Sequence, residues 1–168
     1  MLGHGAMYVP YIIDHGEYYR LYTSMFLHFG FDHLINNMVM LLAIGWNLEC
    51  EIGTIKFAII YFLSGLSGNV ISAFWDIQTG DFAVSAGASG AIFGIVGAIL
   101  YVAIRNRGCV GTITERGVLI MIALSLYYGF SSGGVDNMAH IGGVLSGFIL
   151  AVILYRKKQR KYRSSIWA

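Results

Sequence analysis

Two residues that could together hydrolyse a peptide bond lie in apolar parts of this chain. Ser89 stands in the run Gly87-Ala88-Ser89-Gly90 at the start of one apolar segment, and His140 lies inside a later one. A serine hydroxyl becomes a nucleophile when an adjacent histidine takes its proton. Ionisable side chains are costly in segments that cross a membrane, and those that occur there are commonly functional. The sequence therefore predicts nucleophilic hydrolysis inside a membrane.

Each of these two residues, taken alone, has a simpler explanation. A serine at a helix start is most often an N-cap, and a lone buried histidine is most often a structural hydrogen-bonding residue. We favour catalysis because small residues form a stripe on both segments, and such stripes let helices approach closely in lipid. The stripes are Gly90, Gly94 and Gly97 on one segment and Ala139, Gly143 and Gly147 on the other.

Two other catalytic site types fit less well. The soluble nucleophile elbow, Gly-x-Ser-x-Gly, would need glycine where Ala91 stands, and no alternating strands are predicted, so an α/β-hydrolase is excluded. A zinc site is poorly supported by the sequence, because His28 and His33 do not share a helix face and the chain has no His-Glu-x-x-His motif. We expect neither a metal nor a cofactor.

Donors for the negatively charged oxygen of acyl transfer are predicted in the first apolar segment. His33, Asn36 and Asn37 cluster at its beginning, and an imidazole N–H or an amide could stabilise such an oxygen. The unpaired backbone N–H groups at the start of the Ser89 helix are a further source of partial positive charge.

Composition places these residues in a membrane. Of 168 residues, 57% are hydrophobic and 12% are charged, whereas soluble domains carry roughly 25% charged residues. The 22 glycines fall mostly within apolar runs, where they permit close helix packing. The sequence predicts one all-α, polytopic membrane helical bundle without a second soluble domain.

Five apolar segments are close to the length of about 20 residues that a span needs. We expect them at about 32–48, 54–75, 87–104, 117–131 and 136–155, with the polar side chains of the first and last facing the protein interior. We therefore divide the chain into a membrane-surface loop (1–31), a transmembrane catalytic core (32–155) and a basic cytoplasmic tail (156–168). The tyrosines of 1–31 suit a membrane interface, although an ordinary surface loop would also contain them.

The distribution of basic residues predicts the orientation. Six of the eleven follow the last apolar segment, and three more lie in the loop 105–116. The positive-inside rule places both groups in the cytoplasm, and this is simpler than nucleic-acid binding by the tail. Residues 1–31 then lie outside, with Arg20 as the exception to the rule, and the candidate serine and histidine lie near the outer ends of their helices. Cys50 and Cys109 fall on the inner side, where we expect no disulfide.

In combination, these motifs resemble those of the bacterial rhomboid intramembrane serine proteases, over about residues 8 to 156. The resemblance rests on Gly87-Ala88-Ser89-Gly90 as the nucleophile motif, on Ala139-His140 with Gly143 and Gly147 as the base-bearing helix, and on His28, His33 and Asn37 as the oxyanion helix. Tyr19-Arg20 stands where the family often has Trp-Arg, and Glu49 and Gly53 match an acid and a glycine that follow the oxyanion helix.

The resemblance implies a Ser89–His140 dyad without a third acid, with His33 and Asn37 as oxyanion donors. It implies cleavage of transmembrane protein substrates near the outer face of a bacterial cell membrane. The residues expected to support the site are Gly87, Gly90, Phe93, Ala139 and Gly143. Phe93 stands where a tyrosine is common, and it can stack on the imidazole without hydrogen-bonding.

The resemblance also bears on the number of helices and leaves two alternative functions. The family core has six helices, so we expect this chain to lack the first, which would also explain how the N-terminus comes to lie outside. A non-catalytic rhomboid-like membrane protein that binds clients is the main alternative. A fragment of a transporter or channel would carry an internal repeat, and we find none.

Overall fold

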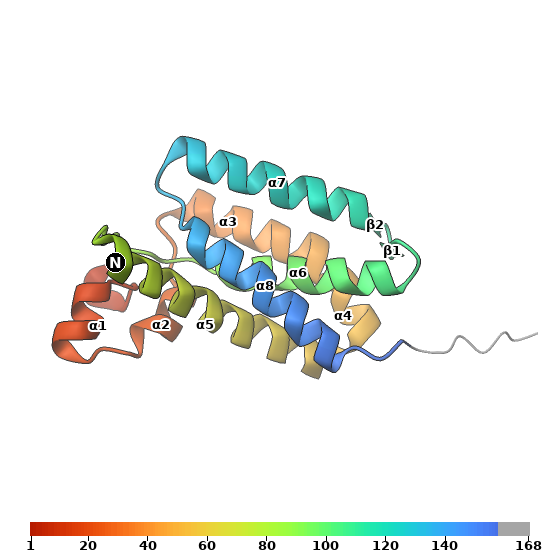
Figure 1. Ribbon diagram of the computed structural model, residues 1–168, viewed down its shortest axis with the longest axis horizontal. Helices are drawn as coiled ribbons and strands as arrows, with labels where there is room; N and C mark the ends of the chain where they lie inside the picture. Colours follow the sequence, from red (N-terminus) through yellow and green to blue (C-terminus); the bar gives the residue numbers. More distant parts are fainter. Residues whose placement is uncertain (158–168) are drawn as a thin grey trace, which may run out of the picture.

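Each apolar segment expected from the sequence is helical in the computed structural model, which describes residues 1–157 (Figure 1). The first segment consists of three consecutive parts, α3 (Phe31–Met40), the π-helical turn η3 (Leu41–Gly45) and α4 (Trp46–Ile52). The other four are α5 (Thr54–Thr79), α6 (Ser89–Arg105), α7 (Glu115–Ser132) and α8 (Asn137–Leu154). The all-α fold class is therefore confirmed.

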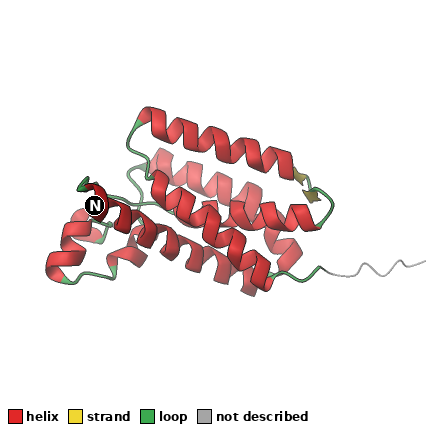
Figure 2. Ribbon diagram, in the orientation of Figure 1, coloured by secondary structure: helices red, strands yellow, loops and turns green. Residues whose placement is uncertain are grey.

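Short elements complete the described chain. Four of them precede α3: η1 (Leu2–His4), α1 (Val9–His15), α2 (Arg20–Thr23) and η2 (Ser24–Phe26). The strands β1 (Cys109–Val110) and β2 (Ile113–Thr114) pair antiparallel as a small hairpin between α6 and α7, visible at the edge of the bundle (Figure 2). They position nothing at the candidate site, which lies at the other end of the bundle.

Helix α6 is the centre of the bundle, because α5 and α8 both pack against it. Thirteen of its seventeen residues are buried. Its glycine stripe meets the stripe of α8, where a Cβ on Gly143 would lie 2.2 Å from the carbonyl oxygen of Gly90. Small residues at such contacts allow van der Waals packing between backbones, which stabilises helix pairs in lipid. The first residue of α6, Ser89, is thereby fixed next to the first turn of α8.

The outer helices expose large apolar side chains, as a lipid-facing surface requires. Ile55 is 79% exposed on α5, and Tyr127 is 73% exposed on α7. Helix α7 lies along the outside of the bundle, above α3 and α8 in Figure 1. A soluble protein rarely exposes so continuous an apolar surface, so the chain is a polytopic membrane helical bundle.

The described helices differ in their ability to cross a bilayer. Helices α5 and α8 are each long and apolar enough to cross a bilayer. A third candidate is the bent pair of helical segments Arg20–Phe26 and Phe31–Ile52, if the two parts, which meet at 89°, count as one span. Helix α6 is apolar but shorter, and α7 begins with Glu115 and Arg116. By length and hydropathy alone, two or three of the five predicted segments could therefore cross a membrane.

The two ends of the bundle carry different groups. The hairpin, α4, the beginning of α5 and the end of α8 lie at one end, which we call the hairpin end, and α1, α2 and the end of α5 lie at the opposite end (Figure 1). Lys157 Nζ donates to Arg105 O at 2.9 Å, so the two predicted cytoplasmic groups meet at the hairpin end. Cys50 and Cys109 are free and exposed.

Part of the predicted basic tail is described. Arg156 and Lys157 are exposed, and the other tail residues expected in the cytoplasm, Lys158, Arg160, Lys161 and Arg163, lie outside the described residues.

Candidate active site

Ser89 and His140 are brought together although 51 positions separate them. The distance from Ser89 Oγ to His140 Nε2 is 2.9 Å. The N-cap of α6 is Ala88, and Ser89 is the first residue of the helix proper, so its hydroxyl does not cap α6. Ser89 is half-buried and His140 is 7% exposed, which leaves the hydroxyl accessible and the imidazole held within the protein.

The role expected of His140 as a base requires one of the two tautomers of its neutral imidazole. A neutral imidazole has one donor and one acceptor nitrogen, and Nε2 must accept if it is to take the proton of Ser89. The other nitrogen, Nδ1, then carries a hydrogen, and it is buried without a hydrogen-bond partner among the described residues. The Phe93 ring stacks on the imidazole instead. The described part of the chain therefore offers a serine–histidine pair without an acid on the histidine.

Gly87 makes room between the first apolar segment and Ser89. Its φ is +150°, in the region that favours glycine. A Cβ at this position would lie 3.0 Å from His33 Cε1 and 3.6 Å from Ser89 Oγ. Any side chain here would therefore separate the histidine of α3 from the serine of α6.

His33 and the start of α6 present donors to the same space. Phe29 N–H donates to His33 Nδ1 at 3.4 Å, so Nε2 of His33 carries the hydrogen, and it lies 3.2 Å from the position of a Cβ on Gly87. The backbone N–H of Ser89 has no backbone acceptor within residues 1–157. Both N–H groups are suited to a developing oxyanion.

The two asparagines of α3 are placed differently. Asn37 is buried at 6% exposure, and its amide donates to His33 O at 2.8 Å, within its own helix. Asn36 is exposed, so the prediction that it faces the interior was wrong. Adjacent helix residues point about 100° apart, so one face cannot bury both amides.

A cleft of about 510 Å³ opens beside the serine–histidine pair. This volume lies within the range of roughly 300–1,000 Å³ that is typical of ligand pockets. The predicted site residues that line it are His33, Gly87, Ser89, Gly90, Ala139 and His140. Asn37, Phe93 and Gly143 do not line it: Phe93 stacks on His140, Gly143 lies against Gly90, and the Asn37 amide donates to His33 O.

Sequence reasoning missed Asp136, Ser72 and Ser85 around the pair, and it gave His28 no role beyond the oxyanion-helix motif. Ala88 N–H donates to His28 Nε2 at 3.4 Å, so His28 steadies the turn that precedes Ser89. The carboxylate of Asp136 accepts hydrogen bonds from Ser72 and Ser85. The available signal was that Asp136 precedes the apolar run of α8 and stands one helical turn before His140.

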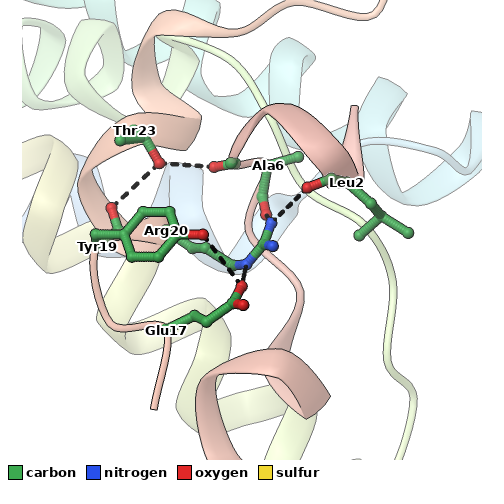
Figure 3. A network of polar contacts seen from close by, with 7 residues as sticks. Leu2, Ala6, Glu17, Tyr19, Arg20 and Thr23 are labelled. Carbon is green, nitrogen blue, oxygen red and sulfur yellow. Dashed lines mark hydrogen bonds and ion pairs between the residues drawn. The ribbon is translucent and has the colours of Figure 1, made fainter. Parts of the chain in front are cut away.

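Arg20 fastens the residues before α3, as Figure 3 shows. Arg20 is 4% exposed, and its guanidinium donates to Leu2 O at 2.8 Å and to Ala6 O at 2.9 Å. It also pairs with Glu17, and that hydrogen bond holds the pKa of the Glu17 carboxyl below its ordinary value. The Tyr19-Arg20 motif thus organises the predicted membrane-surface loop.

Among residues 1–157, no three His, Cys, Asp or Glu side chains are grouped to hold a metal ion.

Comparison with known proteins agrees with the motifs. The family model described as "Rhomboid domain" matches residues 15–157. RHOMBOID-like protein 5 of Arabidopsis thaliana is 40% identical over 156 residues, which are 90% of this chain and 48% of that protein. Rhomboid protease GluP of Bacillus subtilis (strain 168) is 38% identical over 143 residues, 85% of this chain and 27% of that protein.

A shorter relative is covered more completely. Putative rhomboid protease YdcA of Bacillus subtilis (strain 168) is 31% identical over 150 residues, which are 89% of this chain and 74% of that protein. The chain spans less than half the length of RHOMBOID-like protein 5 and of GluP. The resemblance predicted from the motifs is confirmed by these matches.

Proposed function

The chain belongs to the rhomboid family, and from that premise we propose that it is a serine endopeptidase that cleaves transmembrane proteins within the membrane. The observation that carries the proposal is the 2.9 Å contact between Ser89 Oγ and His140 Nε2 at the wall of the cleft. A hydroxyl and an imidazole in hydrogen-bond contact are the parts that covalent hydrolysis requires.

In the proposed reaction, Ser89 Oγ attacks the carbonyl carbon of the scissile peptide bond. His140 Nε2 takes the serine proton and then gives it to the leaving amine, so the C–N bond breaks and an acyl-serine ester remains. A water molecule, deprotonated by the same nitrogen, attacks the ester. The new carboxylic acid leaves, and the proton returns to Ser89.

The oxyanion of each tetrahedral intermediate needs donors. The proposal assigns this role to the Ser89 backbone N–H, to His33 Nε2–H and to Asn37. The Asn37 amide has two N–H groups, and the bond to His33 O uses one of them, so the other is not committed within α3. Donors that are fixed before the reaction stabilise the charge without reorganisation.

The orientation is also proposed. The positively charged loop and the start of the tail lie together at the hairpin end. The cleft is lined by residues from the end of α5 and the starts of α6 and α8, at the opposite end of these helices. The positive-inside rule then places the hairpin end in the cytoplasm of a bacterial cell and the cleft near the outer face. Residues 1–31 form the membrane-surface loop, residues 32–155 the catalytic core, and the tail is cytoplasmic.

The experiment that tests the proposal is reconstitution in lipid vesicles with a tagged single-span reporter substrate. We expect the chain to cut the reporter, and Ser89→Ala to abolish cleavage while Ser132→Ala, at an exposed position of α7, does not. Cleavage by the Ser89→Ala variant would contradict the assignment. Retention of the reporter without cleavage by the unaltered chain would instead favour the non-catalytic binding protein.

A further inference from the structure

Asp136 connects the segment that precedes the serine with the helix that carries the histidine. We propose that Asp136 is a positioning residue of the proposed hydrolysis: its hydrogen bond to Ser85 fixes the Ser89 segment against α8 and so sets the distance between Ser89 Oγ and His140 Nε2. The inference rests on the proposed function. It concerns two residues that take no direct part in the chemistry.

The first turn of α8 is built on Asp136. As the N-cap residue, it accepts the Ala139 N–H at Oδ1 over 2.9 Å, and its backbone carbonyl accepts the His140 N–H at 3.2 Å. An N-cap side chain satisfies a donor that the helix cannot. The backbone of His140 is therefore fixed relative to the Asp136 carboxylate.

The other carboxylate oxygen binds the segment that leads into α6. Ser85 Oγ donates to Asp136 Oδ2 at 2.7 Å. The backbone of Ser85 is held as well, because it exchanges two hydrogen bonds of 2.8 and 2.9 Å with Met7, whose side chain is fully buried. Ser85 is thus a fixed point four residues before Ser89.

The two contacts between these segments run in parallel. Ser85–Asp136 and Ser89–His140 each join residues 51 positions apart, at 2.7 and 2.9 Å. Ser85 stands four positions before Ser89 on one segment, and Asp136 stands four positions before His140 on the other. A displacement of α8 along the segment would lengthen both contacts together, so the first constrains the second.

A third segment keeps the carboxylate in place. Ser72 of α5 is 2% exposed, and its Oγ lies 2.8 and 2.7 Å from the two oxygens of Asp136. Hydrogen bonds to an ionised carboxylate are stronger than those between neutral groups. Three donors from three segments therefore hold one charged group at the wall of the cleft.

Asp136 does not serve as the acid of a triad. Its carboxylate partners are Ser72, Ser85 and the Ala139 N–H, while Nδ1 of His140 has no partner within residues 1–157. Its effect on the reaction is consequently geometric. A misplacement of about 1 Å costs about 10²-fold in rate, so a partial loss of alignment should be measurable.

Two variants remove the contact from opposite sides. Ser85→Ala deletes the hydroxyl and leaves the α8 cap intact. Asp136→Ser keeps a side chain that caps helices well but that is too short to reach Ser85. Asp136→Asn keeps the length and the cap, and its amide can donate to the Ser85 hydroxyl. Ser132→Ala is the matched serine control, because the Ser132 hydroxyl donates to Tyr128 O within its own helix.

The test measures kcat and KM for the reporter in vesicles. Ser85→Ala and Asp136→Ser should each lower kcat about tenfold with KM within about twofold, as expected for a misaligned pair. The double variant should be little worse than either, because both remove the same contact. Asp136→Asn and Ser132→Ala should stay near the unaltered chain. An unchanged kcat in Ser85→Ala, or losses that multiply in the double variant, would overturn the inference.

A second measurement separates this inference from the proposed function. Amide hydrogen exchange of the segment around Ser89 should be faster in Ser85→Ala than in the unaltered chain, whether or not the protein cleaves the reporter. Unchanged exchange would overturn the positioning role by itself. Absence of cleavage by the unaltered chain, combined with faster exchange in the variant, would contradict the proposed hydrolysis and leave the structural contact established.

Discussion

The ring of Phe93 lies flat against the imidazole of His140, with 4.1 Å between the ring centroids and 5° between the planes. Phe93 follows Ser89 by one turn of α6, so the helix that carries the candidate nucleophile also supports the candidate base. Nδ1 of His140 has no hydrogen-bond partner among the described residues, so the contact with Phe93 is the one that limits the tilt of the imidazole plane on this side.

Removing this stack should slow the reaction without preventing it. Aromatic pairs contribute about 0.5–1.5 kcal/mol beyond the area they bury, which corresponds to about 2- to 10-fold in rate. We therefore expect Phe93→Leu to lower kcat by this factor, measured with the vesicle reporter. Phe93→Tyr keeps the ring and should remain close to the unaltered chain. Equal kcat values for the leucine variant and the unaltered chain would show that the stack does not orient the base.

The proposed oxyanion donors can be separated by substitution. Loss of one such donor typically costs about 10²–10³-fold in rate, and redundancy between two side chains reduces this. His33→Ala and Asn37→Ala should each lower kcat more than they raise KM, and the double variant should be slower than either. Asn36→Ala is the matched control, because Asn36 is exposed on the same helix. An undiminished kcat in the double variant would remove both residues from the mechanism.

The contact between α6 and α8 predicts which glycine can be replaced. A Cβ on Gly147 would lie 1.9 Å from the carbonyl oxygen of Gly94, whereas one on Gly3 would meet nothing within 4 Å. Overpacking of this kind costs about 1–3 kcal/mol, more than alanine gains in helix propensity. Gly147→Ala should therefore lower the melting temperature in detergent, and Gly3→Ala should not. Equal melting temperatures for the two variants would mean that the helices can separate at little cost.

Sequence patterns predicted the elements well because their signals are local. Runs of apolar residues marked five helical segments, and the two glycine stripes indicated which helices approach closely. The same reasoning placed Ser89 and His140 at similar depth, since both stand near the start of their helices. The matching stripes predicted that the two helices pack together, although 51 positions separate Ser89 from His140.

What the sequence did not reveal depends on contacts between distant residues. Nothing local to Ser85 indicates that it meets Asp136. At the hairpin end, the sequence singled out Glu49, yet it is Glu51 that accepts from Tyr155 Oη at 2.9 Å and from Asn106 Nδ2 at 3.1 Å. Two acids so close in sequence differ only in the helix face that they occupy, and packing decides which of them is used.

The orientation of the bundle can be tested with reporter fusions in cells. The positive-inside rule predicts that an enzyme reporter that is active only in the cytoplasm will be active when it is fused after Ala168. The same reporter fused at Gly80, at the end of α5, should be inactive. The reverse pattern would place the cleft on the cytoplasmic side and contradict the proposed site of cleavage.

Active-site labelling tests the central claim, that Ser89 is a nucleophile activated by His140. The chain in lipid vesicles is treated with a fluorophosphonate, and the modified peptide is identified by mass spectrometry. We expect one labelled residue, Ser89, with labelling abolished in Ser89→Ala and strongly reduced in His140→Ala, while the circular dichroism spectra of the variants stay helical. Labelling of a different serine, or labelling of Ser89 that is equally fast without His140, would contradict the account.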